Sequence, residues 1–421
     1  MIFIFSNVDY HISKGSLKTK QCPKSQLHMV NYNKDAMFDV DDDFSSKFRS
    51  VIFTKDLERV MCFSPPKSCS LSDLTKALHT DKLDEDQIIA EEIIEGTMIN
   101  LFYDTENGCW EVATKNRIRA ENMFFRDKTG DGKTFREMFM ETMKFTNLDL
   151  VTLDKHYCYS FVMQHPDNNI IKFVEHPRLF LVAVFLCSYD FNAKTNIISS
   201  VDVGEIRKTN MFDQCNVQYP RRFENWRDLD TLFKDWCLFF PEKDFAYVPG
   251  IMLFSKDGSQ RSKYRNPKYE YLRILRGNQP KLQYHYLTLR KEYRVLEYLQ
   301  CFPYHASEFE KFGKEVHDYT LQMVAYYNEC FTSADPDGLL QKLVSTRRNY
   351  AKYGKQISLL LGKVSEEKKE ELEEGEIDAN ESDEDDDDDD DDDDDSLITY
   401  TKMANYLNTL PVKLLMHLIN L

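Results

Sequence analysis

Glycine and proline are scarce in this sequence, with 14 and 13 residues in 421, which excludes a collagen-like or low-complexity chain. The ten cysteines include no CxxC pair, and the ten histidines show no HExxH spacing, so we expect neither a metal site nor a disulfide framework. No apolar run reaches the roughly 18–20 residues that span a bilayer. The apolar start Met1–Phe5 is too short for a signal peptide. We therefore predict a protein without a membrane partner in a reducing compartment, the cytosol or the nucleus.

Negative charge is concentrated in one stretch of the chain. The formal net charge is −17, but Glu366–Asp395 alone holds 22 acidic residues and two lysines. The remaining 52 basic and 49 acidic residues give +3, so the overall acidity does not exclude a nucleic acid partner. Such a tract is typical of a solvated, disordered linker. Loose cation binding and mimicry of nucleic acid toward a basic protein partner are the alternatives.

Hydrophobic residues make up 42% of the chain, which is enough for a sizeable core, and the length suggests two or three domains. Residues 1–47 are polar, and we expect them to form a loosely packed N-terminal arm. Residues 48–280 alternate short strands with helices, which predicts an α+β domain. We expect residues 281–365 to form a helical domain and residues 366–395 to be the disordered acidic tract. Residues 396–421 should form a helix that docks on the helical domain and kinks at Pro411.

Within the α+β domain, alternating apolar residues and turn signals predict strands. Thr134 and Glu137 form a capping box that predicts a helix over 134–145, and Trp226–Trp236 predicts a second helix. Pro249 should place the last strand at a sheet edge or a bulge. The predicted strands are Val51–Thr54, Arg59–Phe63, Gly96–Tyr103, Trp110–Thr114, Tyr157–Met163, Ile170–Val174, Leu179–Ser188 and Tyr247–Ser255.

Two rows of basic residues suggest a phosphate-binding surface. Lys115, Arg117 and Arg119 alternate, so in an extended segment they would share one face. Arg261, Lys263 and Arg265 alternate in the same way. If the rows lie on neighbouring strands, they form a channel for the phosphates of a nucleotide or a nucleic acid. The alternative for each row is an ordinary solvated face of a sheet.

Two further sets of polar residues lie beside apolar strands. Glu95, which precedes Gly96 and Thr97 at the start of a strand, is either a ribose or metal ligand or a surface residue at a hairpin entry. His156, His165 and His176 are spaced nine and eleven residues apart, which matches no usual metal-ligand set. We expect these histidines to be structural.

Taken in order, these segments resemble the covalent nucleotidyltransferase superfamily, in particular phage-type ATP-dependent RNA ligases and a ligase-like group of large DNA viruses. The resemblance covers residues 48–280. Val51–Lys67 is similar to the hairpin ahead of the nucleotide-binding lysine in those enzymes, and Glu95-Gly96-Thr97 to the continuation of their K-x-D-G motif. Lys115 with Arg117 resembles the basic motif that comes next in those enzymes, and Pro166–Ile171 resembles their P-x-N-R-I-V string. Gly250–Leu253 resembles the E-G-hydrophobic motif, and Arg261–Lys263 resembles the final K-x-K.

The resemblance implies a ligase-type nucleotidyltransferase domain, built from antiparallel sheets flanked by helices, and a helical C-terminal domain. It implies RNA or a nucleotide as partner, ATP and Mg²⁺ as cofactors if the protein is active, and the host cytoplasm if it is viral. The resemblance implies that the nucleotide- and phosphate-binding residues are Glu95, Gly96, Thr97, Lys115, Arg117, Arg261 and Lys263.

The sequence also departs from the ligase motifs. In the K-x-D-G register the lysine position is Ile93, which cannot attack an α-phosphate. The E-G motif reads Pro249-Gly250, and Tyr159–Met163 lacks the expected glutamate. Lys115 is the candidate replacement nucleophile, with Lys67 as another. Three hypotheses stay open: an RNA end-joining or repair enzyme with an altered site, a catalytically inactive ligase-like protein that binds RNA or nucleotide, and an assembly protein.

Overall fold

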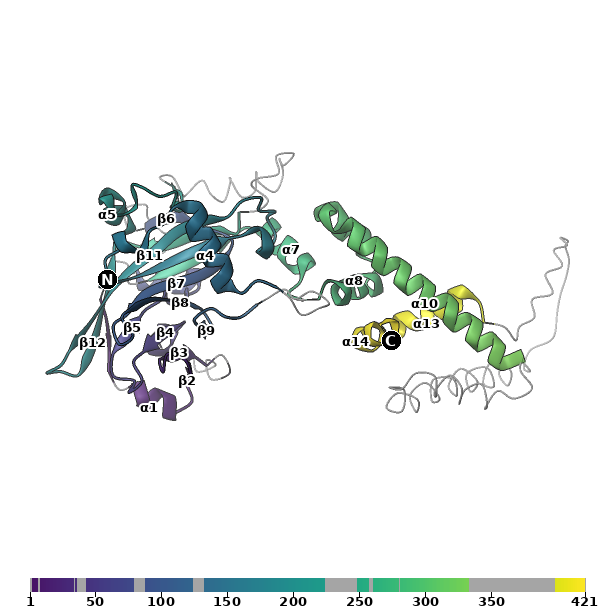
Figure 1. The fold of residues 1–421 in the computed structure, drawn as a ribbon, viewed down its shortest axis with the longest axis horizontal. Helices are drawn as coiled ribbons and strands as arrows, with labels where there is room; N and C mark the ends of the chain where they lie inside the picture. Colours follow the sequence, from purple (N-terminus) through teal and green to yellow (C-terminus); the bar gives the residue numbers. More distant parts are fainter. Residues whose placement is uncertain are drawn as a thin grey trace. The chain divides into compact units, whose positions relative to one another are not determined.

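The computed structural model describes residues 2–6, 8–33, 35, 43–78, 88–123, 132–223, 248–256, 260–279, 281–332 and 398–420. The chain divides into two compact units, Met1–Pro280 and Lys281–Leu421, which are coloured purple to teal and green to yellow in Figure 1. The first unit contains the antiparallel sheets and the second is helical among its described residues. The predicted α+β class with a helical C-terminal region is therefore confirmed.

A seven-stranded antiparallel sheet is the centre of the first unit. Buried residues follow one another over residues 99–102 and 158–164 of its central strands, so both faces of the sheet are covered. Helix α4 (Phe135–Thr146) covers one face of the sheet (Figure 1). Met138 and Phe139 of this helix are buried in the same core as Leu101. The capping box predicted for this helix is present. In spatial order the strands are β1 (Ile2–Phe5), β12 (Thr195–Val201), β11 (Arg178–Asp190), β10 (Tyr157–Gln164), β7 (Thr97–Asp104), β8 (Cys109–Thr114) and β9 (Arg117–Ile118).

The other face of the large sheet packs against a small sheet made by the N-terminal residues. Phe3 and Phe5 of β1 are buried in this core together with Met29 and Phe102. The predicted polar arm over residues 1–47 is therefore wrong, because its scattered apolar residues complete a core that is assembled from distant strands. The small sheet has the order β2 (Leu17–Gln21), β3 (His28–Tyr32), β4 (Val51–Phe53) and β5 (Val60–Cys62). In the chain, α1 (Val8–Ser13) precedes β2, and α2 (Asp43–Ser46) lies between β3 and β4.

A third sheet carries the second basic row. Its order is β13 (Arg222–Phe223), β6 (Ile88–Glu92), β14 (Gly250–Ser255) and β15 (Arg261–Arg265). Leu74 of α3 (Leu71–Ala77) packs with Ile251 and Leu253 on one face. The edge position predicted from Pro249 is wrong, because this residue precedes β14 and β14 lies between two partners. Gly250 has a φ of 141°, and a Cβ there would lie 2.2 Å from the Tyr264 carbonyl oxygen.

The remaining elements of the first unit are short. They are α5 (Val203–Lys208), α7 (Pro267–Arg276) and the 3-10 helices η1 (Leu150–Thr152), η2 (Pro166–Asn168) and η3 (Asn210–Phe212). The strand predicted over Ile170–Val174 is absent from the described structure, because the Ile171 amide is bound by a glutamate side chain instead of a neighbouring strand. The helix predicted over Trp226–Trp236 lies outside the described residues.

The second unit consists of α8 (Leu282–Lys291), α9 (Val295–Cys301), η6 (Pro303–His305), α10 (Ala306–Thr332), α13 (Tyr400–Thr409) and α14 (Val412–Ile419). Helix α13 packs on α10 and α14 packs on α8. The C-terminal residues thus form two helices that separate at Pro411, the residue before α14. The acidic tract 366–395 lies outside the described residues. Among the helices that are described, none is long and apolar enough to cross a membrane.

Candidate functional site

Several positively charged side chains from different elements meet around Lys263 of β15. Burial lowers the pKa of Lys263, and the charges of Arg49, Arg261, Arg265 and Lys115 lower it further, to about 8. Lys115 also lies against Tyr32, with its Nζ 3.5 Å from the hydroxyl oxygen and 5.4 Å from the ring centroid. The Nζ of Lys67 is 5.9 Å from the same centroid. We call Arg49, Lys67, Lys115, Arg261 and Lys263, with Tyr32, the cationic cluster.

The three sheets supply these side chains at the ends or edges of strands. Tyr32 ends β3, Arg49 precedes β4, and Lys115 lies in the turn between β8 and β9. On β15 the residues alternate, so Arg261 and Lys263 share one face while Ser262 is buried on the other. The cluster therefore depends on contacts between residues that are far apart in the sequence.

Among the residues that the structure describes, little negative charge compensates the cluster. Arg49, Lys115, Arg261 and Lys263 form no ion pair with any carboxylate in the described part of the chain. Burial lowers the pKa of Arg49, and burial with the nearby Arg49 charge lowers the pKa of Arg261. Arg261 donates to the Pro66 carbonyl oxygen, while its buried Nε has no acceptor among the described atoms. Because clustered cations that are partly removed from water repel one another, an anion with several oxygens would be bound strongly here.

The two predicted basic rows behave differently in the structure. The second row is extended on β15, and Arg265 at its exposed end pairs with Glu270. The first row is not extended, because β8 ends before Lys115 and the chain turns back into β9. Arg117 on β9 is exposed. Of the three residues in the first row, Lys115 is the one whose charge lowers the pKa of Lys263.

Arg119, the last member of the first row, is used for structure. Its φ of 69° turns the chain, and its guanidinium pairs with Glu111 at 3.2 Å and with Glu121 at 3.0 Å. The interpretation of residues 115–119 as one extended face is therefore wrong. Alternating basic residues are compatible both with an extended strand and with a tight hairpin.

Glu95 and Thr97 form a second polar group, at the start of β7. Glu95 is 7% exposed, and its Oε1 accepts hydrogen bonds from the Ile171 and Lys172 amides at 3.0 Å each. Burial raises the pKa of Glu95, and these amides partly offset the rise. The Thr97 hydroxyl accepts a hydrogen bond from the Asn168 side chain at 2.8 Å. Glu95 and Thr97 thus hold the segment that follows η2.

Gly96 lies between these two residues and allows β7 to approach β10. Its φ is 149°, and a Cβ would lie 2.5 Å from the Met163 carbonyl oxygen and 2.7 Å from the Val162 side chain. The residue is therefore required for close strand packing. Gly96 supports the site by placing Glu95 and Thr97 against the segment after β10.

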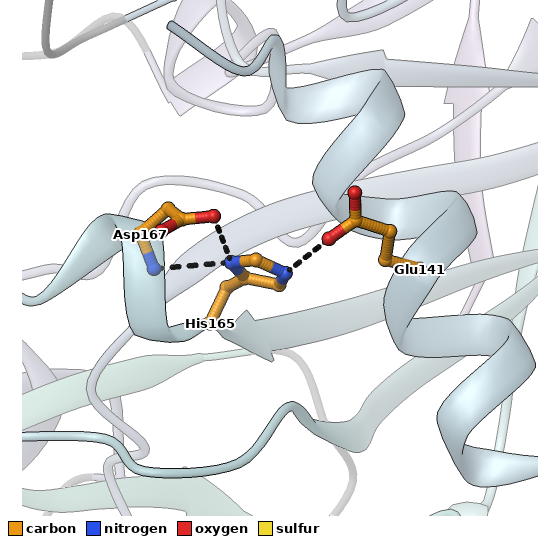
Figure 2. A group of neighbouring side chains, drawn as sticks. All are labelled: Glu141, His165 and Asp167. Atoms are coloured by element: carbon orange, nitrogen blue, oxygen red, sulfur yellow. Dashed lines mark hydrogen bonds and ion pairs between the residues drawn. The ribbon is translucent and has the colours of Figure 1, made fainter.

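A third group, Glu141, His165 and Asp167, lies where α4 meets η2 (Figure 2). His165 Nδ1 accepts the Asp167 amide at 3.1 Å, so Nε2 carries the proton and donates to Glu141 at 3.1 Å. Burial lowers the pKa of His165. The ligand atoms lie within 4.8 Å of one another, but Lys133 Nζ already lies 2.8 Å from Glu141 and 2.9 Å from Asp167.

We therefore interpret this third group as a structural one that fixes η2, because Lys133 already neutralises the negative charge of both carboxylates. The other two histidines of the sequence pattern lie elsewhere. His156 pairs with Asp154 at 2.7 Å, and His176 stacks on Phe145 with the ring centroids 5.9 Å apart.

Sequence reasoning missed Arg49 and Tyr32 as parts of the cluster. Tyr32 belongs to residues 1–47, for which the sequence predicts a loosely packed arm, and Arg49 is an isolated basic residue before a strand. The available signal was the strand-favouring residues Val30 and Tyr32 in His28–Tyr32, which forms β3.

No protein-family model matches the chain. Over 98 residues, 22% of this chain and 22% of the relative, it is 34% identical to an RNA ligase of Rhodothermus phage RM378. Over 264 residues it is 22% identical to an immediate-early protein ICP-46 homolog of Invertebrate iridescent virus 6, covering 58% of this chain and 54% of that one. The chain thus spans about a fifth and about half of the length of these curated relatives.

Two solved structures overlap much of the chain. A putative ATP-dependent DNA ligase from Aquifex aeolicus has a TM-score of 0.39 at 14% identity, covering 81% of this chain and 88% of that one. An archaeal ATP-dependent RNA ligase has a TM-score of 0.37 at 12% identity, covering 73% and 69%. The local identity to the phage RNA ligase supports a relationship to ligase-type nucleotidyltransferases.

Proposed function

We propose that this protein is a ligase-like nucleotidyltransferase relative that binds the phosphates of a nucleotide or of an RNA end in the cationic cluster. The observation that carries the proposal is the meeting of Arg49, Lys115, Arg261 and Lys263 without a described carboxylate partner. Phosphate provides several acceptor oxygens and negative charge, which match guanidinium and ammonium donors. The sequence similarity to a phage RNA ligase favours RNA as the partner.

The role of ATP and Mg²⁺ follows from the same donor set. Arg49, Lys115 and Lys263 would hold the triphosphate of ATP, which supplies an activated nucleotidyl group when it is bound. The donors fit the phosphates better than the metal ion, because Mg²⁺ prefers oxygen ligands and these side chains are cations. A Mg²⁺ ion at this site would therefore be held mainly by phosphate oxygens and water.

Glu95, Gly96 and Thr97 have a positioning role in this proposal. Glu95 binds the Ile171 and Lys172 amides after η2, and Thr97 binds Asn168, the last residue of η2. We propose Arg117 as a peripheral contact for a nucleic acid backbone, because it is exposed two residues after Lys115.

Binding of a 5′-phosphorylated RNA oligonucleotide, measured by fluorescence anisotropy over a salt series, tests the proposal. Lys115→Ala and Lys263→Ala should each weaken binding about tenfold and reduce the slope of log K against log salt by about one. Lys194→Ala, which removes an exposed lysine from the turn between β11 and β12, is the control and should change neither quantity. Unchanged affinity and slope in both cluster variants would contradict the proposal.

A second candidate function is binding without catalysis, because Ile93 stands where the ligase resemblance expects the nucleophilic lysine. Isoleucine has no lone pair with which to attack phosphorus. Incubation with α-labelled ATP or GTP and Mg²⁺ or Mn²⁺ separates the two functions. A covalent, acid-labile adduct indicates an enzyme, and its absence alongside retained nucleotide binding indicates a binding protein.

A further inference from the structure

We infer that Lys263 takes the place of the missing lysine at Ile93 and is the nucleophile of a covalent nucleotidyl transfer. This inference rests on the proposed function, since it requires a nucleoside triphosphate in the cationic cluster. It assigns to Lys263 a chemical role beyond phosphate binding, and it leaves Lys115 as a phosphate ligand.

The strand register places Lys263 on the same face of the third sheet as Ile93. Met252 of β14 pairs with Lys263 on one side and with Glu91 of β6 on the other, so these three residues share a face. The Ile93 amide donates to the Gly250 carbonyl oxygen at 2.9 Å, which continues this register by two residues. Because side chains alternate along a strand, Ile93 and Lys263 point to the same side of the sheet, two strands apart.

Neighbouring strands lie about 4.8 Å apart and residues rise about 3.4 Å along a strand, so two strand spacings and the two-residue offset separate the backbones at these positions by roughly 12 Å. A lysine side chain extends about 6 Å beyond its Cα when its four methylene groups are extended. An amine from β15 can therefore reach toward the region over β14 that a lysine at residue 93 would also reach.

The other lysines of the cluster are engaged differently. Lys115 is within hydrogen-bond distance of the Tyr32 hydroxyl, and its ammonium lies over the Tyr32 ring. The ammonium of Lys67 lies over the same ring. Lys263 has no hydrogen-bond acceptor among the described residues. Of these three lysines, Lys263 is therefore the one whose ammonium has no aromatic partner among the described residues.

The charges around Lys263 favour its neutral, nucleophilic form. Arg49, Lys115, Arg261 and Arg265 face it, and burial together with these charges lowers its pKa to about 8. At pH 7 about a tenth of such amines are neutral, compared with less than about one in a thousand for an ordinary lysine. A lysine beside other cations is a recognised form of activated nucleophile. The same arginines would neutralise the departing pyrophosphate.

The proposed step is an in-line displacement. The lone pair of Lys263 Nζ attacks the α-phosphorus of the nucleoside triphosphate, and a phosphorus–nitrogen bond forms. The bond between the α-phosphorus and the bridging oxygen breaks, and pyrophosphate leaves with that electron pair. The amine loses one proton to solvent. The product is a nucleotidyl-lysine, and no oxidant or reductant is needed.

The experiment uses the full-length protein, α-labelled ATP and GTP, and Mg²⁺ or Mn²⁺, followed by intact-mass measurement and peptide mapping. Wild type should acquire one acid-labile nucleotidyl group on the peptide that contains Lys263. Lys263→Arg should lose more than 100-fold of this labelling while nucleotide affinity changes less than threefold, because the charge is retained. Lys194→Arg, at an exposed position in the turn between β11 and β12, is the matched variant and should still form the adduct. The initial labelling rate of wild type should rise between pH 7 and pH 9, with an inflection near pH 8.

The outcomes distinguish this inference from the proposed function. Label that persists in Lys263→Arg, or that maps to another lysine, overturns the assignment to Lys263. A wild-type protein that binds nucleotide but forms no adduct at any pH from 6 to 9.5 also overturns it and leaves phosphate binding intact. A wild-type protein that binds neither nucleotide nor RNA overturns the proposed function itself.

Discussion

One buried histidine should give the stability of the first unit a pH dependence. His165 is 2% exposed, and burial lowers its pKa although Glu141 and Asp167 lie beside it and Lys133 bridges them. The unfolded chain takes up a proton near pH 6.5, which the folded protein resists. The stabilising contribution is therefore complete above about pH 6.5 and is lost as the pH falls toward the lowered pKa.

His165→Gln should remove this component. In urea denaturation followed by tryptophan fluorescence, the wild-type free energy of unfolding should fall between pH 7 and pH 5 more steeply than that of the variant. All three tryptophans lie within residues 1–280, so the signal reports the first unit. His156→Gln is the control, because the His156 side chain is 82% exposed. Equal pH slopes in wild type and His165→Gln would show that burial of this ring does not perturb its titration.

Gly96 provides a second residue-level prediction. Gly96→Ala forces a Cβ to within 2.5 Å of a backbone oxygen at a φ of 149°, so the free energy of unfolding should fall by about 2–3 kcal/mol. Gly15→Ala is the matched control, since Gly15 also has a positive φ but has no atom within 4 Å of the added Cβ. The control should cost less than about 1 kcal/mol. Equal losses in the two variants would show that backbone strain alone, without the contact with β10, sets the cost.

Among the structural elements, those specified by neighbouring residues were predictable. The hairpins at 51–63 and 96–114 and the capped helix at 134–146 follow from turn residues and a capping box within a few positions. Elements that depend on distant partners were not. Strand β1 exists because Ile2–Phe5 pairs with Asn196–Ser199 of β12, almost two hundred residues later.

The same distinction applies to the candidate site. Lys263 and Lys115 could be selected from the sequence because basic residues alternate there. Arg49 and Tyr32 could not, since their contribution arises from tertiary packing of the small sheet near β15. The turn at Lys115 shows why alternation is insufficient on its own, since a two-residue hairpin preserves the pattern and changes the direction of the side chains.

The role of β1 as part of the core can be tested directly. Phe5 is fully buried against Phe48 and Phe63, whereas Ile4 on the same strand is 63% exposed. Phe5→Ala should lower the free energy of unfolding by about 3–5 kcal/mol because it leaves a cavity. Ile4→Ala should change it by about 0.5 kcal/mol. If both variants were as stable as wild type by urea denaturation, the N-terminal residues would be a dispensable arm after all.

On the scale of the whole molecule, charge is divided unevenly. Glu366–Asp395 contributes −20 to a net charge of −17, and the rest of the chain carries +3. If the cationic cluster binds RNA, we expect a polyanionic tract in the same chain to compete with RNA for cationic side chains, because both present closely spaced negative charges. Replacing the tract with a glycine-serine stretch of equal length removes this competition and keeps the chain length.

The replacement should strengthen binding of a 5′-phosphorylated RNA at 50 mM salt by about tenfold or more, and the gain should shrink at 500 mM salt because screening shortens the range of charge interactions. Combining it with Lys263→Ala and Lys115→Ala should remove most of the gain, which would locate the competition at the cationic cluster. Equal RNA affinity with and without the tract at both salt concentrations would argue that the tract acts on another molecule. In that case capture of a basic protein partner, lost on replacement of the tract while RNA binding is retained, would support the assembly role.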